Sequence, residues 1–245
     1  EELAAEWGLG ELPWLAKRFS HSILKTALEL YIPQLVTDSD RLLAIGDPQI
    51  PKTASSEEVV ASIRRGLSGA NLELEDLASL PNTSTELRTI ASVFPGNSEL
   101  MLQASATEQN VRAALVSSPG VLTFATHGLL SGELKNLNES ALLLTPGPDS
   151  NNSFDDGLLT TSEIADLSIS AKFISLSACN TAIYEPGLFT NQVGGLTAAF
   201  QLAGARTILG TLWPVETTSA ELINSSLYSE EQFQEGDFST ALNQS

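Results

Sequence analysis

Short apolar runs alternate with segments of helical spacing along this chain. The apolar runs are residues 41–46, 99–103, 121–126, 141–145, 172–178 and 205–213. The helical segments are residues 84–94 and 107–116, with Ser84 and Thr107 as their expected caps, and residues 161–167 and 193–203, followed by one more to residue 228. Strands that are separated by helices pair in parallel, and the helices then cover both faces of the sheet. The pattern therefore predicts an α/β fold of three layers around a mostly parallel central sheet.

The 245 residues suffice for one large domain or two small ones. The alternation continues without a break, so we predict a single domain over residues 1–245, in which residues 1–80 are less regular and residues 81–228 form the core. No internal repeat with a period of 20–50 residues is present. Neither an initiator Met nor a signal peptide opens the chain, so we expect it to be cut from a longer protein.

Charge and residue counts exclude several classes of function. Thirty acidic residues against 12 basic ones give a net charge of −18. This charge repels nucleic acids and anionic membranes and favours basic protein segments as partners. A need for solubility alone is a competing explanation of the charge. A single Cys allows no internal disulfide, and two His supply too few ligands for a structural zinc site. No apolar run approaches the length of a membrane span. We expect a cytoplasmic protein without metal or cofactor.

Two reactive side chains follow two of the predicted strands directly. His127 comes after Val121–Thr126, and Cys179, the only Cys, comes after Lys172–Ala178. The carboxyl ends of parallel strands lie at one edge of a sheet, so we expect both side chains there. Their separation is 52 residues, and caspase-type enzymes carry a His about 50 residues before a nucleophilic Cys in an Ala-Cys context.

The pair has the chemistry of a cysteine nucleophile with its base. A thiol attacks as its thiolate, and a neighbouring imidazole takes that proton and returns it to the leaving amine. The backbone N–H groups of Gly128 and Cys179 are the candidates for stabilising the oxyanion. A lone Cys is more often a small buried apolar residue and a lone His is more often structural, but the combination and its spacing favour catalysis.

Several sequence blocks resemble the CHAT domain, a caspase-like module found beside tetratricopeptide repeats, mostly in bacteria. The blocks are LLAIGDP (42–48), Glu86–Phe94, Ala106-Thr107-Glu108, VLTFATHG (121–128), ALLLT (141–145), GLLTTSEIADLSI (157–169), ISLSACNTA (174–182) and GGLTAAFQLAGARTILGTLWPV (194–215). Their order and spacing fit the family over about residues 40–228.

The resemblance implies a caspase-hemoglobinase type fold and a Cys-His dyad that cleaves protein or peptide substrates. It also implies that an activating protein partner or upstream tetratricopeptide repeats sometimes control the activity. One block departs from the family, because Thr190–Val193 stands where members often carry Gly-Glu-Gly. A catalytically silent interaction or signalling module is therefore an alternative. A nucleotide-binding α/β protein fits the fold pattern but lacks a phosphate motif.

Three residues are candidates for substrate binding. Ser177 lies two residues before Cys179. Related enzymes that cleave after Arg or Lys carry Asp at this position. Ser177 therefore argues against a basic residue at P1, the substrate residue before the cleaved bond. Asp155 and Asp156 lie in a loop with the reach to border the substrate groove. The competing interpretation of these two acids is an ordinary solvated loop.

Overall fold

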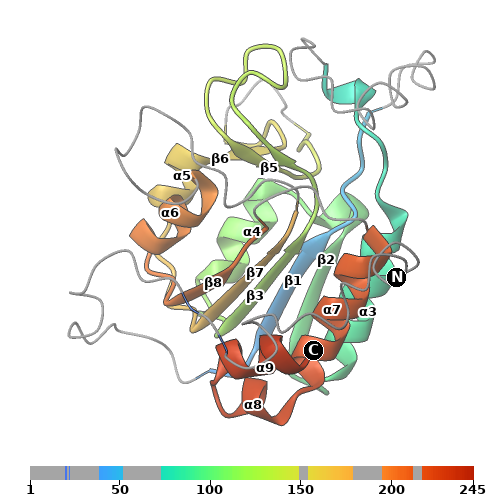
Figure 1. The fold of residues 1–245 in the computed structure, drawn as a ribbon. Coiled ribbons are helices and arrows are strands. Elements are labelled where there is room, and N and C mark those ends of the chain that lie inside the picture. Colours follow the sequence, from blue (N-terminus) through green and yellow to red (C-terminus); the bar gives the residue numbers. More distant parts are fainter. Residues whose placement is uncertain are drawn as a thin grey trace, which may run out of the picture.

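A five-stranded parallel sheet organises the molecule (Figure 1). The computed structural model describes residues 20, 22, 39–51, 73–148, 154–178, 195–211 and 217–245. The sheet has the order β2-β1-β3-β7-β8, and its strands are β1 (Leu42–Gly46), β2 (Ser98–Leu102), β3 (Val121–Ala125), β7 (Phe173–Ser177) and β8 (Thr207–Leu209). Every pairing in this sheet is parallel. The mostly parallel sheet that the sequence predicts is confirmed.

Helices cover both faces of the sheet (Figure 1). One face carries α3 (Pro81–Ser92), α7 (Thr217–Ser229), α8 (Glu231–Gln234) and α9 (Phe238–Gln244). The other carries α4 (Glu108–Leu115), α5 (Thr161–Ala165) and α6 (Gly195–Leu202). Successive side chains of a strand point to opposite faces, so Leu42 and Ala44 join the first core and Leu43 and Ile45 the second. This is the predicted three-layer architecture.

Tyr228 anchors α7 to the sheet. It is fully buried, and its ring contacts Phe94, Phe173 and Phe233 at centroid distances of 6.1, 6.1 and 4.7 Å. Its hydroxyl forms a hydrogen bond with the hydroxyl of Thr123 on β3. These contacts fix the orientation of α7. Asn224 lies one turn earlier on the same face of this helix, so its position is fixed as well.

A second, antiparallel sheet lies beyond the carboxyl end of β3. Its strands are β4 (Gly128–Leu129), β5 (Ala141–Leu143) and β6 (Leu158–Thr160), in that order. The apolar run at 141–145 is thus a strand, as predicted, but it pairs outside the central sheet. Two residues carry no periodicity, so the sequence did not predict β4. Because β4 starts directly after His127, this small sheet borders the candidate site.

Helix starts follow local chemistry. The Thr107 hydroxyl caps α4 by accepting a hydrogen bond from the N–H of Asn110 at 3.2 Å, which confirms the predicted cap. The prediction that Ser84 caps the next helix upstream is wrong, because α3 begins at Pro81. Proline suits the first turn of a helix, where its missing N–H has no partner to lose. Two 3-10 helices complete the described elements, η4 (Leu74–Asp76) and η5 (Gln103–Ser105).

Candidate active site

His127 lies two residues beyond the last residue of β3, where the main chain is bonded to β5. The hydroxyl of Thr126 donates a hydrogen bond to the carbonyl oxygen of Leu143 at 2.5 Å. The N–H of Leu143 donates in turn to the carbonyl oxygen of His127 at 2.9 Å. Both bonds hold the chain as it leaves the central sheet, so the position of the His127 imidazole is set by two sheets at once.

The ring of His127 is oriented by a main-chain oxygen. Its Nε2 lies 2.8 Å from the carbonyl oxygen of Ala78, in the segment between η4 and α3. A carbonyl oxygen only accepts, so Nε2 must carry the proton. In a neutral imidazole the other nitrogen, Nδ1, then has the free lone pair. His127 is thus in the tautomer that takes a proton at Nδ1.

The surroundings favour the neutral form of this imidazole. Burial lowers the pKa of His127 from its ordinary value, and the hydrogen bond to Ala78 offsets that effect only in part. A histidine with a lowered pKa is unprotonated at neutral pH. His127 therefore meets the requirement for a general base in both its tautomer and its charge.

The strand register of β3 and β7 has the same offset as the predicted pair. Parallel pairing sets Ala125 of β3 opposite Ser177 of β7, an offset of 52 positions, which equals the separation of His127 and Cys179 in the sequence. Cys179 itself lies outside the described residues. The preceding residue, Ala178, has its carbonyl oxygen bonded to the hydroxyl of Thr211 at 2.6 Å. The chain that leads to Cys179 is thereby tied to the segment that follows β8.

A cavity of about 200 Å³ lies beside His127. Its polar lining includes Ser177, Thr211, Glu86 and Asn224, and most of its remaining lining is apolar. Of the three predicted substrate-binding residues, Ser177 therefore lines the same cavity as His127. The cavity is bounded by the ends of β3, β7 and β8 and by helices α3, α7 and α9.

Glu86 is a member of this cavity that the sequence reasoning did not assign to the site. Its side chain is only 1% exposed, and its Oε1 accepts a hydrogen bond from Nδ2 of Asn224 at 2.8 Å. Burial raises the pKa of Glu86, hydrogen bonds from Asn224 and Ser177 lower it, and the negative charge of Glu221 raises it.

A signal for Glu86 was present in the helical pattern. The buried positions of α3 are Thr83, Glu86, Leu87, Ile90 and Ala91. The acid occurs at a helical spacing that otherwise carries apolar residues and one Thr. Charged residues are rarely buried without a partner, so an acid on a buried helix face is a candidate for function.

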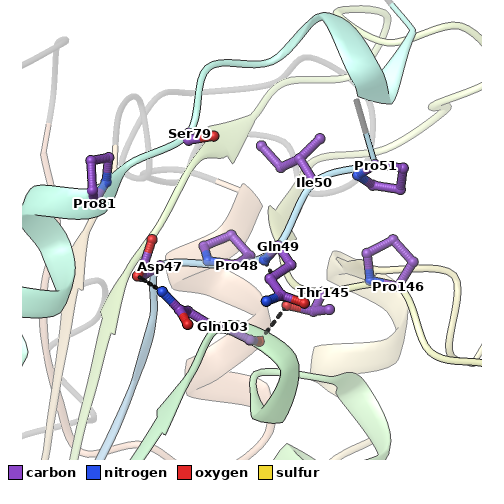
Figure 2. Close-up of a pocket in the computed structure, with 10 residues that line it drawn as sticks. All are labelled: Asp47, Pro48, Gln49, Ile50, Pro51, Ser79, Pro81, Gln103, Thr145 and Pro146. Carbon is purple, nitrogen blue, oxygen red and sulfur yellow. Dashed lines mark hydrogen bonds between the residues drawn. The ribbon is translucent and has the colours of Figure 1, made fainter. Parts of the chain in front are cut away.

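A second, larger cavity of about 560 Å³ lies at the carboxyl ends of β1 and β2 (Figure 2). Asp47 follows β1 directly, is 7% exposed and has a left-handed backbone with φ of 47°. Its Oδ2 accepts a hydrogen bond from Nε2 of Gln103 at 3.2 Å. The hydroxyl of Thr145 donates to the carbonyl oxygen of Gln103 at 2.6 Å and accepts from the N–H of Gln49 at 2.9 Å. These bonds connect the ends of β1, β2 and β5.

Residues 78–80 separate the two cavities. Ser79 lines the larger cavity, Leu80 lines the smaller one, and the carbonyl oxygen of Ala78 holds His127. Both hollows lie along the carboxyl edge of the sheet, and of the two only the smaller is lined by His127. This is the edge of a parallel sheet at which ligands bind, and the order β2-β1-β3 makes β1 and β3 the switch point between the two directions of winding.

Asp155 and Asp156 lie elsewhere, in the connection between β5 and β6. The carbonyl oxygen of Asp155 accepts from the N–H of Gly147 at 2.9 Å, and its carboxylate occupies the place of a side chain at that glycine. Oδ1 of Asp156 accepts from the N–H of Leu158 at 2.9 Å. Neither lines either cavity. Their role in substrate binding stays a prediction.

Gly128, the other oxyanion candidate, is buried and is the first residue of β4. It directly follows His127 in the sequence, and its role in stabilising the oxyanion stays a prediction.

Comparisons with known proteins decide the family. The sequence model of the CHAT domain matches residues 3–245, which is nearly the whole chain. The chain belongs to the CHAT domain family. The resemblance of the sequence blocks to this family is thereby confirmed. No curated protein matches this chain.

A search of solved structures found similarity to the Arg specific cysteine proteinase gingipain R (RGPB), whose structure was determined by crystallography. The two share 11% sequence identity with a TM-score of 0.47, over 86% of this CHAT domain and 43% of the proteinase chain. The aligned part is therefore less than half of that proteinase.

Two further findings concern the described part of this CHAT domain. No group of three or more His, Cys, Asp or Glu side chains within it is arranged to hold a metal ion. Among its helices, none combines the length and the apolar character that a membrane crossing requires.

Proposed function

We propose that this CHAT domain is a cysteine endopeptidase with Cys179 as nucleophile and His127 as general base. The observation that carries the proposal is the state of His127. Its Nε2 is hydrogen-bonded to the carbonyl oxygen of Ala78, which leaves Nδ1 to accept a proton. His127 also lines the same cavity as Ser177 and Ala178, the two residues before Cys179.

The reaction follows from these roles. Nδ1 of His127 takes the thiol proton of Cys179, and the thiolate sulfur bonds to the substrate carbonyl carbon to give a tetrahedral oxyanion. The backbone N–H groups of Gly128 and Cys179 are proposed to stabilise that oxyanion. When the oxyanion collapses, the C–N bond breaks and His127 returns the proton to the leaving amine.

A thioester remains and is hydrolysed by the same groups. His127 takes a proton from water, the hydroxide bonds to the thioester carbon, and the C–S bond breaks. The proton then returns to the sulfur, so that acid product and free thiol are restored. The substrate is a protein or peptide, and a protein partner or tetratricopeptide repeats in the same polypeptide are proposed to control access to the site.

An electrophilic thiol probe that carries a short peptide tests the pair. We compare the labelling rates of the wild type, Cys179→Ala and His127→Ala at neutral pH. We expect no labelling without Cys179 and a loss of about 100-fold or more without His127, the usual scale of general-base catalysis.

The other histidine supplies the matched control. His21→Ala removes the same side chain from a different position and should label at the wild-type rate. Equal rates for His127→Ala and the wild type would refute the proposed base. A wild type that is folded but never labelled would refute an assembled dyad in this chain.

A further inference from the structure

The cavity beside His127 has the size of one side chain and walls that suit an aliphatic stem. Its volume of about 200 Å³ is below the roughly 300–1,000 Å³ of pockets that hold small molecules. Leu80, Leu209, Ile223 and Leu242 contribute apolar surface. Because His127 and Ala178, the residue before Cys179 in the sequence, both line this cavity, a side chain inside it would belong to a substrate residue at the cleaved bond.

The polar part of the cavity contains one acid, Glu86, among the described residues that line it. Glu86 accepts a hydrogen bond from Asn224, a neutral donor, and the negative charge of a second acid, Glu221, raises the pKa of Glu86. None of the described residues that line the cavity is Lys or Arg. Burying this carboxylate costs solvation free energy, which the hydrogen bonds from Asn224 and Ser177 offset only in part, and a cationic ligand group would offset more of it.

We propose that this cavity is the P1 pocket and that Glu86 receives the positive end of a basic substrate side chain, Lys or Arg. The inference rests on the proposed function, because P1 is defined by attack of Cys179. It differs from the expectation that Ser177 disfavours a basic P1 residue. The acid comes instead from α3, and Ser177 is one of the groups bonded to it.

A purely structural role for Glu86 makes a different prediction. Through Asn224 it also joins α3 to α7, so removing it affects stability in either case. A structural Glu86 would leave the preference for P1 residues unchanged. The informative readout is therefore a ratio of rates between probes that differ only in the charge of the P1 side chain.

Matched peptide probes provide that ratio. Lys is compared with norleucine, which has the same stem without the amine, and Arg with citrulline, which has the same shape without the charge. In the wild type we expect at least one basic probe to label Cys179 about tenfold faster than its neutral partner, the scale of a hydrogen bond to a charged group. In Glu86→Gln, which keeps an oxygen for Asn224, the ratio should fall to about one.

The control is Glu235→Gln, which removes one acid from the surface and should keep the wild-type ratio. Neutral probes that react as fast as basic ones in the wild type, or ratios that Glu86→Gln leaves unchanged, would overturn the proposal.

A binding measurement separates this proposal from the proposed activity. If no probe labels the wild type, the peptidase proposal fails, and the pocket is then tested in Cys179→Ala with N-acetyl-lysine and N-acetyl-arginine methylamides. We expect at least one of them to shift the NMR signals of the Asn224 side-chain amide, while its norleucine or citrulline counterpart does not. Equal or absent shifts would overturn the basic pocket independently of catalysis.

Discussion

At the scale of single residues, the site depends on one main-chain oxygen. The carbonyl of Ala78 fixes both the orientation and the tautomer of His127, although the two residues lie 49 positions apart. Most substitutions of Ala78 would keep this acceptor, because the carbonyl oxygen belongs to the main chain. The orientation of His127 therefore depends on the path of residues 78–80 rather than on the side chain of Ala78.

The state of His127 gives a prediction for its titration. Burial disfavours the imidazolium, so the folded pKa should lie below the ordinary value of 6.5. The sign for stability follows, because the unfolded chain then binds more protons. Stability from this group is complete above pH 6.5 and is lost as the pH falls toward the folded pKa. NMR titration of the imidazole in Cys179→Ala, which removes coupling to the thiol, measures the value.

His21→Gln in the same background leaves one histidine and assigns the signal. A pKa at or above 6.5 for His127 would contradict the partly buried ring, bonded to the Ala78 carbonyl, that the structure describes.

At the scale of elements, α4 and the β5–β6 connection meet at a buried acid. Glu108 is fully buried, and its Oε1 accepts a hydrogen bond from the N–H of Gly157 at 2.9 Å. Arg112 lies 3.8 Å from the carboxylate of Glu108 and 3.2 Å from that of Glu163. Burial, followed by the charge of Glu163, raises the pKa of Glu108 to about 7, with a smaller contribution from Asp156 and opposing ones from Gly157 and Arg112.

This acid predicts a pH-dependent stability. The folded pKa is about 7 against 4.5 for the free group, so the native state binds the additional proton between these values. The contribution of Glu108 is complete below pH 4.5 and is lost as the pH rises through 7. Relative to Glu108→Gln, the wild type should lose up to about 3 kcal/mol of unfolding free energy between pH 4.5 and 8.

Urea unfolding of both proteins at several pH values measures this difference. Glu235→Gln, an exposed acid, should follow the wild type throughout. Parallel curves for the wild type and Glu108→Gln would show that Glu108 does not titrate in this range.

Elements that the sequence predicts are those with a strong local signal. Buried strands such as β3 and β7 are continuous apolar runs, and the Thr107 cap precedes a periodic helix. Pairing partners depend on residues far apart in the chain, so the apolar run at 141–145 predicts a strand but not its place in the second sheet. The helix start at Ser84 was wrong because a proline three residues earlier already begins the helix.

The candidate site was predictable to the same degree. His127 was found because a reactive side chain follows a recognisable strand. Ala78 was not found, because any residue supplies a carbonyl oxygen and only the tertiary structure shows which one faces the ring. Glu86 was visible as an acid on a buried helix face, but its cavity depends on α7 and α9, which lie far along the chain.

At the scale of the whole molecule, the order of the strands decides which residues meet at the carboxyl edge of the sheet. The order β2-β1-β3-β7-β8 sets β3 and β7 side by side at the centre, with β1 on the other side of β3. The ends of β1, β3 and β7 thereby carry Asp47, His127 and the segment before Cys179 along one edge. A chain with the same strands in another order would bury equally good cores and separate these residues.

The net charge of −18 adds a property that belongs to the molecule as a whole. Like charges repel more strongly in the compact state than in the unfolded chain, so screening should stabilise the fold. At pH 7.5, raising NaCl from 0.02 to 0.3 M should increase Tm, and each kcal/mol gained moves Tm by roughly 2–4 °C. The control is the same measurement near pH 4.5, close to the isoelectric point of about 4.3, where the effect should nearly vanish. An equal rise in Tm at both pH values would assign the effect to a general action of salt on apolar surface. A fall in Tm at pH 7.5 would mean that attractive ion pairs, such as Arg112 with Glu163, outweigh the net repulsion.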